Sequence, residues 1–334
     1  MTEVFISRKT FDDVLNHFDE AGLSYFHNAA DDPLSPAQLA EQLREAGATA
    51  LMSVLTDRVD AALLDAAPRL RIVANVAVGY NNVDVPAATE RGIVVTNTPD
   101  VLTETTADLA FALILAAARR LSEADPFMRA GKYKRWQLFQ PHLGLDVYGK
   151  TLGIVGMGRI GAAVARRGAL GFGMRILYYG RHVAEKAEQA WGAQRVELHT
   201  LLRQSDFVSL HVPLSDETRH LIAARELAMM KRTAILVNTS RGPVVKEDDL
   251  VTALREGTIA GAGLDVYEDE PQMKPGLADM YRHIVLTPHI GSATTETRLR
   301  MSMTAAQNAS AVLLGRRAPN PVNPEVMGEV GEEG

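Results

Sequence analysis

The chain has 334 residues, of which 46% are hydrophobic and 23% charged, with a formal net charge of −6 and no cysteine. This length exceeds the size at which one hydrophobic core stops growing, so two domains are predicted. The acidic balance argues against a nucleic-acid partner, and the lack of cysteine excludes disulfides and thiolate chemistry. Because no signal-peptide pattern is visible and the longest apolar run, 109–118, is too short to span a bilayer, we expect a cytoplasmic protein with no membrane partner.

Short apolar, β-branched segments alternate with amphipathic segments along the chain, which is typical of parallel sheets covered by helices. One long helix is predicted from about 106 to 131, with Thr105 and Asp108 as a capping pair. Shorter helices are predicted at Pro36–Ala46, after the cap residue Ser35, and at 59–66. The first series of predicted strands covers residues 4–7, 23–27, 50–55, 72–77 and 93–96.

A second series of strands follows the long helix, and another helix, 294–314, closes the chain. The two long helices are candidates for crossings between domains, which makes the first domain discontinuous. We therefore predict two doubly wound parallel-sheet domains of the α/β class. A Rossmann dinucleotide-binding domain, residues 101–289, is inserted in a flavodoxin-like substrate domain, residues 1–100 and 290–334. The second series covers residues 151–155, 175–179, 207–211, 234–238, 262–266 and 284–287.

The glycine-rich segment after strand 151–155 is the most specific local motif. It reads Gly156-Met157-Gly158-Arg159-Ile160-Gly161, and a helical pattern continues beyond it. In such a loop Gly156 makes the tight turn, Gly158 lets the backbone approach a pyrophosphate, and Gly161 lets the helix pack against the strand. The pyrophosphate then sits on the helix N-terminus. Because strand, loop and helix occur in the required order, the motif predicts a bound dinucleotide.

The end of the next strand indicates which dinucleotide is used. Strand 175–179 is followed by Gly180-Arg181-His182, whereas an acidic residue there would bind the ribose 2′-hydroxyl of NAD. Without that carboxylate nothing repels a 2′-phosphate, and Arg181 offers donors to it. The sequence therefore predicts NADPH as cofactor. NADH stays possible, because Arg181 could also be a solvated loop residue.

Charged residues follow the last three strands of the second series, where ligands bind in open α/β sheets. Arg241 follows one strand, Asp265 and Glu270 follow the next, and His289 follows the last. Reduction of a keto acid needs a cation for the carboxylate, a proton donor for the developing alkoxide, and a carboxylate that keeps the donor charged. Each of these residue types alone is more often structural, so the specificity lies in their combination.

This combination resembles the D-isomer-specific 2-hydroxyacid dehydrogenase family, and within it the glyoxylate/hydroxypyruvate reductase and 2-ketogluconate reductase branch. The resemblance extends over almost the whole chain. Two positions depart from the family pattern: Asn81 stands where Asp is common, and Gly180 replaces the usual acid. Besides the glycine loop, the resemblance is carried by Val78-Gly79-Tyr80-Asn81-Asn82-Val83-Asp84, Thr96-Asn97-Thr98-Pro99-Asp100-Val101-Leu102-Thr103, Ser240-Arg241-Gly242, Gly263-Leu264-Asp265-Val266 and Pro288-His289-Ile290-Gly291-Ser292-Ala293.

The resemblance implies a role for each matching residue. Arg241 would bind the substrate carboxylate and polarise the keto group, while backbone amides of Val78 and Gly79 would hold the same carboxylate from the other domain. His289, paired with Glu270, would be the general acid in reduction and the base in oxidation. Further cofactor contacts are expected from Thr106, Pro213, Thr218, Thr239, Asp265, His289 and Gly291, with Asp265 on the nicotinamide carboxamide.

The predicted reaction is reduction of a small 2-keto acid, glyoxylate or hydroxypyruvate, to the D-2-hydroxy acid. Reduction of 2-ketogluconate is the main alternative, because it differs only in the room that the first domain leaves. Phosphite dehydrogenases resemble the same scaffold but carry a lysine where this chain has Val78. Corepressors that sense a dinucleotide also share it, but the short N-terminus and the lack of a long disordered tail disfavour that function.

Two further expectations concern metals and partners. The histidines show no metal-ligand spacing such as HExxH, so no metal site is predicted. The segment 132–148 is long, contains several aromatic residues and a glycine, and is poorly explained as a plain linker. Because the equivalent segment of the family reaches across a dimer interface, the resemblance implies a homodimer.

Overall fold

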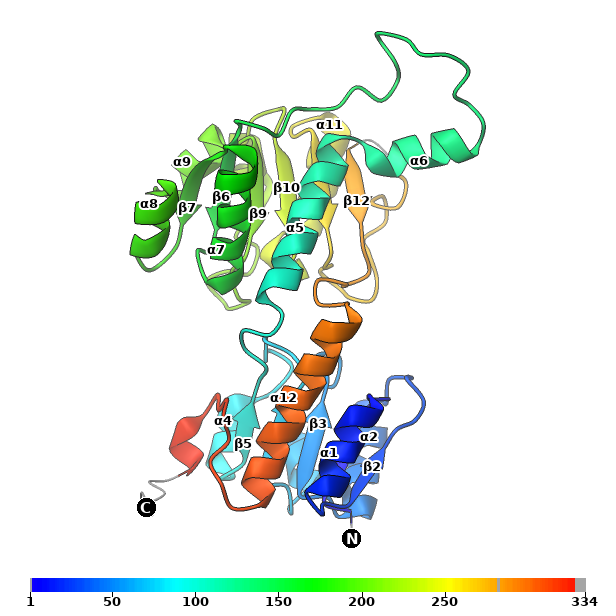
Figure 1. Cartoon of the computed structure of the whole chain (residues 1–334), viewed down its shortest axis with the longest axis vertical. Helices are drawn as coiled ribbons and strands as arrows, with labels where there is room; N and C mark the ends of the chain where they lie inside the picture. The colour runs from blue at the N-terminus through cyan, green and yellow to red at the C-terminus, as the bar shows by residue number, and fades with distance from the viewer. Residues whose placement is uncertain (1, 281–282, 328–334) are drawn as a thin grey trace. The chain divides into compact units, whose positions relative to one another are not determined.

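The computed structural model describes residues 2–280 and 283–327 and forms two compact units, each built on a parallel β-sheet covered by helices (Figure 1). Unit 1 contains the described residues up to Leu102 and from Ala293 onward, and unit 2 is Thr103–Ser292. The tail 328–334, predicted to belong to the substrate domain, lies outside the described residues. No helix in the described part of the chain is long and apolar enough to cross a membrane. The predicted α/β class with two parallel-sheet domains is confirmed.

Unit 1 has a five-stranded sheet with the order β2-β1-β3-β4-β5. This is the strand order of flavodoxin-like folds. Its elements are β1 (Val4–Ile6), α1 (Asp12–Glu20), β2 (Tyr25–His27), α2 (Pro36–Ala46), β3 (Ala50–Ser53), α3 (Ala61–Ala66), β4 (Ile72–Asn75), α4 (Val85–Glu90), β5 (Val94–Thr96), α12 (Thr295–Leu313) and a short 3-10 turn, Pro324–Met327.

Helices cover both faces of this sheet because successive strand residues point to opposite sides. In β3, Leu51 packs with α2, α3 and α4, whereas Ala50 and Met52 pack with α1 and α12. The predicted start of α2 is confirmed. The Ser35 hydroxyl accepts a hydrogen bond from the Gln38 amide, and the Gln38 side chain accepts one from the Ser35 amide. These cores fix the carboxyl ends of β3 and β4, from which the loops of interest emerge.

Unit 2 has a seven-stranded sheet with the order β12-β11-β10-β9-β6-β7-β8. The order reverses between β6 and β9, and ligands of doubly wound sheets bind at the carboxyl ends of strands at such a point. Its elements are α5 (Thr103–Ala118), α6 (Leu121–Arg129), β6 (Thr151–Val155), α7 (Arg159–Arg166), a π-helical turn (Arg167–Gly171), β7 (Arg175–Tyr179), α8 (Glu185–Trp191), β8 (Gln194–Arg195), α9 (Leu198–Gln204), β9 (Phe207–Leu210), α10 (Ala224–Met229), β10 (Ile235–Asn238), a 3-10 turn (Gly242–Val244), α11 (Glu247–Glu256), β11 (Gly261–Leu264) and β12 (Ile284–Leu286).

The single helix predicted from 106 to 131 is wrong, because the structure has two helices there, α5 and α6. Arg120 between them adopts a left-handed conformation with φ of 54°, which ends the helical path. Its guanidinium pairs with Glu123 at 2.6 Å and donates to the Pro141 carbonyl at 2.8 Å. The capping pair at Thr105 is also wrong, since α5 begins at Thr103.

Candidate active site

The glycine loop of unit 2 joins β6 to α7 at the reversal of strand order. Gly156 has a φ of +97°, which L side chains rarely adopt, and a Cβ there would lie 2.7 Å from the His211 carbonyl oxygen. A Cβ at Gly161 would overlap the Gly156 carbonyl oxygen. Only glycine therefore allows α7 to start this close to β6. Arg159 and Ile160 form the first turn of α7, as the motif predicts.

Gly158 differs from the other two glycines because nothing lies within 4 Å of the position that its Cβ would take. It is the N-cap of α7, so the first amides of the helix open onto this space. A side chain at 158 would occupy the space without disturbing the protein. The loop thus leaves the room that a pyrophosphate on a helix N-terminus requires, and its residues fit a dinucleotide.

The carboxyl end of β7 lies beside the glycine loop, because a Cβ at Gly180 would be 3.7 Å from the Met157 amide nitrogen. Arg181 follows and is exposed. Arg195 of the edge strand β8 holds this turn by donating to the Gly180 carbonyl at 2.9 Å and to the Arg181 carbonyl at 3.2 Å. The turn beside the loop therefore carries an exposed arginine and no carboxylate.

Asp265 organises the segment that carries His289. It is 1% exposed and follows β11. Its Oδ1 accepts the Thr287 hydroxyl at 2.6 Å and the Ile290 amide at 2.8 Å, and its Oδ2 accepts the Gly291 amide at 2.8 Å. These bonds fix the backbone on both sides of His289, a contribution that the sequence did not indicate.

His289 and Glu270 form a close pair. Nδ1 of His289 lies 3.0 Å from Oε2 of Glu270, and the two side chains are 25% and 30% exposed. The other oxygen, Oε1 of Glu270, accepts the Tyr267 amide at 3.3 Å. His289 has a φ of 53°, a strained conformation for a residue other than glycine that tends to occur at functional sites. Because Nδ1 faces the carboxylate, Nε2 is the ring nitrogen available for chemistry.

Arg241 lies in the same cluster. It follows β10, and its Nη1 donates to the Ser240 carbonyl at 2.7 Å while Asn238 Nδ2 donates to the Arg241 carbonyl at 3.0 Å. Burial lowers the pKa of Arg241, and the charge of Glu270 opposes that shift. A Cβ at Gly242 would overlap the Tyr267 carbonyl oxygen, so the turns after β10 and β11 pack in direct contact. The structure therefore brings Arg241, Glu270 and His289 together.

The other predicted cofactor contacts surround these turns in unit 2. The hydroxyl of Thr239 is buried, with no hydrogen-bond partner among the residues that the structure describes. Such a group costs free energy unless a ligand completes it. Thr106 of α5 lies 3.4 Å from the Cβ position of Gly291. Thr218 closes the turn after β9 by donating to the Pro213 carbonyl at 2.6 Å.

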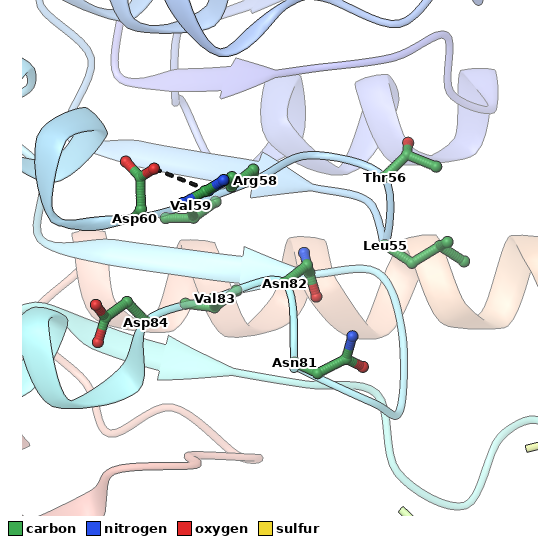
Figure 2. Close-up of a pocket in the computed structure, with 9 residues that line it drawn as sticks. All are labelled: Leu55, Thr56, Arg58, Val59, Asp60, Asn81, Asn82, Val83 and Asp84. Carbon is green, nitrogen blue, oxygen red and sulfur yellow. Dashed lines mark ion pairs between the residues drawn. The ribbon is translucent and has the colours of Figure 1, made fainter. Parts of the chain in front are cut away.

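In unit 1, Val78 and Gly79 lie in the loop after β4. The same loop, continuing to Asp84, and the loop after β3 line a pocket of about 480 Å³. Figure 2 shows Leu55 from the loop after β3 and Asn81 and Asn82 from the loop after β4. The two loops are joined by a parallel bridge, Val59 to Val83. The polar loop ends of unit 1 thus form one continuous surface.

Sequence reasoning assigned no role to His211, which follows β9 at the reversal of strand order. Its Nε2 lies 2.8 Å from the Ser209 hydroxyl, and desolvation lowers its pKa to about 3. His211 therefore stays neutral at physiological pH. Its position one strand away from the glycine loop was the signal that could have singled it out.

Comparisons with known proteins agree with this geometry. A family model for the NAD-binding domain of D-isomer specific 2-hydroxyacid dehydrogenases matches residues 111–291. The glyoxylate reductase of Korarchaeum cryptofilum is 57% identical over 296 residues, which cover 88% of each chain.

Solved structures are similar over nearly the full length. A protein of Thermus thermophilus has a TM-score of 0.88 and 44% identity, covering 96% of this chain and 100% of that chain. The NADPH-dependent glyoxylate/hydroxypyruvate reductase of Sinorhizobium meliloti, in complex with NADP and malonate, has a TM-score of 0.84 and 36% identity, covering 97% of both chains. The resemblance seen in the sequence is confirmed, and the chain belongs to the D-isomer-specific 2-hydroxyacid dehydrogenase family.

Proposed function

We propose that this protein uses NADPH to reduce a small 2-keto acid, glyoxylate or hydroxypyruvate, to the 2-hydroxy acid, with the D configuration where the product is chiral. The observation that carries the proposal is the hydrogen bond between His289 and Glu270 in the same cluster as Arg241. The names of similar proteins, glyoxylate reductase and glyoxylate/hydroxypyruvate reductase, support this substrate class.

Arg241 would bind the substrate carboxylate. A guanidinium offers two parallel donors that match a carboxylate, and partial burial strengthens such a contact because less water competes. The amides of Val78 and Gly79 would supply further donors to the same carboxylate. This arrangement would select 2-keto acids over simple aldehydes, which lack the carboxylate.

His289 would move the proton. Its Nε2 would donate to the keto oxygen as negative charge develops there, and Glu270 on Nδ1 would favour the protonated ring that this step needs. Hydrogen bonds to Asp265 on both sides of His289 would keep the ring in place. When bound, the nicotinamide dinucleotide supplies the hydride that reduces the keto carbon.

Preference for NADPH rests on the turn after β7. Gly180 carries no charge to repel a 2′-phosphate, and Arg181 is exposed beside the glycine loop. A guanidinium at this position can pair with the phosphate through two hydrogen bonds. Since NADH lacks that phosphate, it would gain nothing from Arg181.

The experiment is a steady-state assay of the purified protein with glyoxylate, hydroxypyruvate and 2-ketogluconate, each with NADPH and with NADH. We expect the highest kcat/KM for glyoxylate or hydroxypyruvate with NADPH, and chiral analysis should identify D-glycerate as the product from hydroxypyruvate. Faster turnover of 2-ketogluconate would refute the substrate class, and faster turnover with NADH would refute the cofactor preference. No turnover with any combination of keto acid and cofactor would refute the proposed reductase activity.

We also propose that the protein is a homodimer. Figure 1 shows α6 and the loop that follows it projecting away from the rest of unit 2. Large apolar side chains concentrate there, with Trp136 70% exposed and Phe139 83% exposed. Apolar side chains that gather at one exposed site mark an interaction surface, and the dimer-forming segment expected at 132–148 is the one that carries them.

Light scattering during size-exclusion chromatography tests the dimer. We expect the mass of two chains for the wild type and a shift toward one chain for the double variant Trp136→Ser, Phe139→Ser. The matched control is Leu170→Ser, an exposed apolar residue of unit 2 outside this segment. A wild-type mass of one chain, or a double variant that stays at two chains, would contradict the assignment.

A further inference from the structure

Consecutive backbone carbonyls after β4 in unit 1 are held by donors from the neighbouring segment. The Ala77 carbonyl accepts the Thr98 amide at 2.9 Å, and the Val78 carbonyl accepts Nδ2 of Asn97 at 2.8 Å. The Gly79 carbonyl is held as well, by a side chain of β4 itself. The loop thus has its carbonyl oxygens turned toward the body of unit 1.

The peptide geometry then sets the direction of the amides. In a planar trans peptide, the carbonyl of one residue and the amide of the next point in opposite directions. Fixing the carbonyls of Ala77 and Val78 therefore turns the amides of Val78 and Gly79 away from the donors. Among the residues that the structure describes, neither amide has a recorded intramolecular acceptor. They are adjacent donors directed out of the loop, which is what a carboxylate needs.

Asn75, the last residue of β4, holds the Gly79 carbonyl. Its Nδ2 donates to that oxygen at 3.1 Å and to Oδ1 of Asn82 at 3.4 Å. Its Oδ1 accepts the Ser53 hydroxyl at 3.1 Å and Nδ2 of Asn82 at 3.2 Å. These bonds use the full capacity of a primary amide. Asn75 is 0% exposed, so it cannot itself contact a substrate.

Asn82 connects this amide to the loop after β3. Its Nδ2 donates to the Val54 carbonyl at 3.1 Å and to the Asp57 carbonyl at 3.0 Å. Asp57 in turn forms a buried ion pair with Arg8 at 2.9 Å. Figure 2 shows Asn82 on the wall opposite the loop that carries Leu55 and leads to Asp60. The two loops are therefore fixed to each other and to the body of unit 1.

The buried amide of Asn75 at this place requires an explanation. Burying an amide costs free energy unless each donor and acceptor is satisfied, and an apolar side chain would fill the same end of β4 without that cost. Here the Asn75 amide holds the Gly79 carbonyl, and the Asn82 amide bonds to Asn75 and to carbonyls of the loop after β3. We propose that Asn75 and Asn82 are positioning residues: by holding the Gly79 carbonyl, they anchor the end of the segment whose Val78 and Gly79 amides face the substrate carboxylate. This inference rests on the proposed function.

The test replaces Asn75 by aspartate, which has nearly the same shape. At position 75 the new oxygen would face the Gly79 carbonyl instead of donating to it, so the Gly79–Tyr80 peptide should turn and the adjoining Val78 and Gly79 amides should shift with it. We expect KM for glyoxylate to rise about tenfold to a hundredfold while kcat falls much less, since misplacement of a binding group by about 1 Å can cost that much. The affinity for NADPH, measured by fluorescence titration without substrate, should stay within about twofold.

The matched control is Asn323→Asp in the same unit. Asn323 is also buried, and it accepts the Val95 amide at 2.7 Å and donates to the Ile93 carbonyl at 3.0 Å, at the amino end of β5. Both changes should lower the melting temperature, because each buries a new charge. Only the change at position 75 should raise KM for the keto acid.

Two further variants cover the case in which Asn75→Asp does not fold. Without adding charge, Asn75→Ser removes the bond to the Gly79 carbonyl, and Asn82→Ser removes the bonds that hold the Asn75 amide in place. Both should raise KM. Unchanged KM in a folded variant with a lower melting temperature, or an equal rise of KM in Asn323→Asp, would overturn the inference. A wild type that reduces no keto acid would instead refute the proposed function, so the two failures are distinguishable.

Discussion

Oε2 of Glu270 lies 3.0 Å from Nδ1 of His289, so the imidazole is held by one nitrogen and presents the other. This geometry supports the proposed role of His289 as the general acid. The pair sits on two different turns, after β11 and after β12, and both turns are joined to Asp265 or its neighbours by hydrogen bonds. Its alignment is therefore a property of the fold of unit 2.

Replacing His289 by asparagine should lower kcat for glyoxylate reduction by about a hundredfold or more, since a positioned general acid contributes about that much. The affinity for NADPH should be nearly unchanged. Glu270→Gln should lower kcat as well, but less than His289→Asn does, because the amide side chain can still bond to Nδ1 while it carries no negative charge. A His289→Asn variant with near-normal kcat, or a Glu270→Gln variant with wild-type kcat, would count against the pair.

Alanine substitutions at two glycines of the glycine loop should have different effects. Gly158→Ala should fold with wild-type stability, because nothing lies within 4 Å of the new Cβ, but it should lose affinity for NADPH about tenfold or more since the methyl group occupies the space left for the pyrophosphate. Gly161→Ala should lower the melting temperature, because its Cβ overlaps the Gly156 carbonyl oxygen. Thermal unfolding and NADPH titration of both variants decide this. A Gly158→Ala variant that binds NADPH normally would place the cofactor elsewhere.

Much of this fold could be predicted because its strands are apolar runs with sharp ends. The strands Thr151–Val155 and Arg175–Tyr179 and the helix Pro36–Ala46 were predicted to the residue, since each is bounded by glycine or a capping residue. The break between α5 and α6 could not be predicted, because it depends on the contacts of Arg120 with Glu123 and Pro141 rather than on a local breaker. The edge strand β8 is only Gln194–Arg195 and has no periodic pattern.

The candidate site was predictable to a similar extent, and the supporting contacts were not. Charged residues after strand ends are visible in a sequence, so Arg241, Glu270 and His289 could be singled out together. The bonds of Asp265 to the backbone around His289 depend on how two distant turns approach each other. The hydrogen bonds between Asn75 and Asn82 could not be predicted either, since the sequence does not indicate which partners polar residues near strand ends will find.

The preference for NADPH over NADH should depend on Arg181. Arg181→Ala should lower kcat/KM with NADPH by about tenfold to a hundredfold, the equivalent of about 1.4 to 3 kcal/mol for a charge-assisted contact, and should leave kcat/KM with NADH within about twofold. The matched control is Lys186→Ala, which removes another exposed cation from the same region of unit 2 and should change neither value. An equal loss with both cofactors would show that Arg181 acts on the shape of the turn rather than on the phosphate.

His211 should make the protein sensitive to acid. Desolvation lowers its pKa from 6.5 to about 3, so the folded protein holds the ring neutral while the unfolded chain binds a proton below pH 6.5. A depressed pKa in the folded state gives stability that is complete above 6.5 and is lost progressively as the pH falls from there toward about 3. His211→Asn keeps a neutral side chain able to bond to Ser209 and removes this titration. Its melting temperature should therefore fall less than that of the wild type between about pH 7 and about pH 5, and parallel curves for the two proteins would show that His211 does not control the acid response.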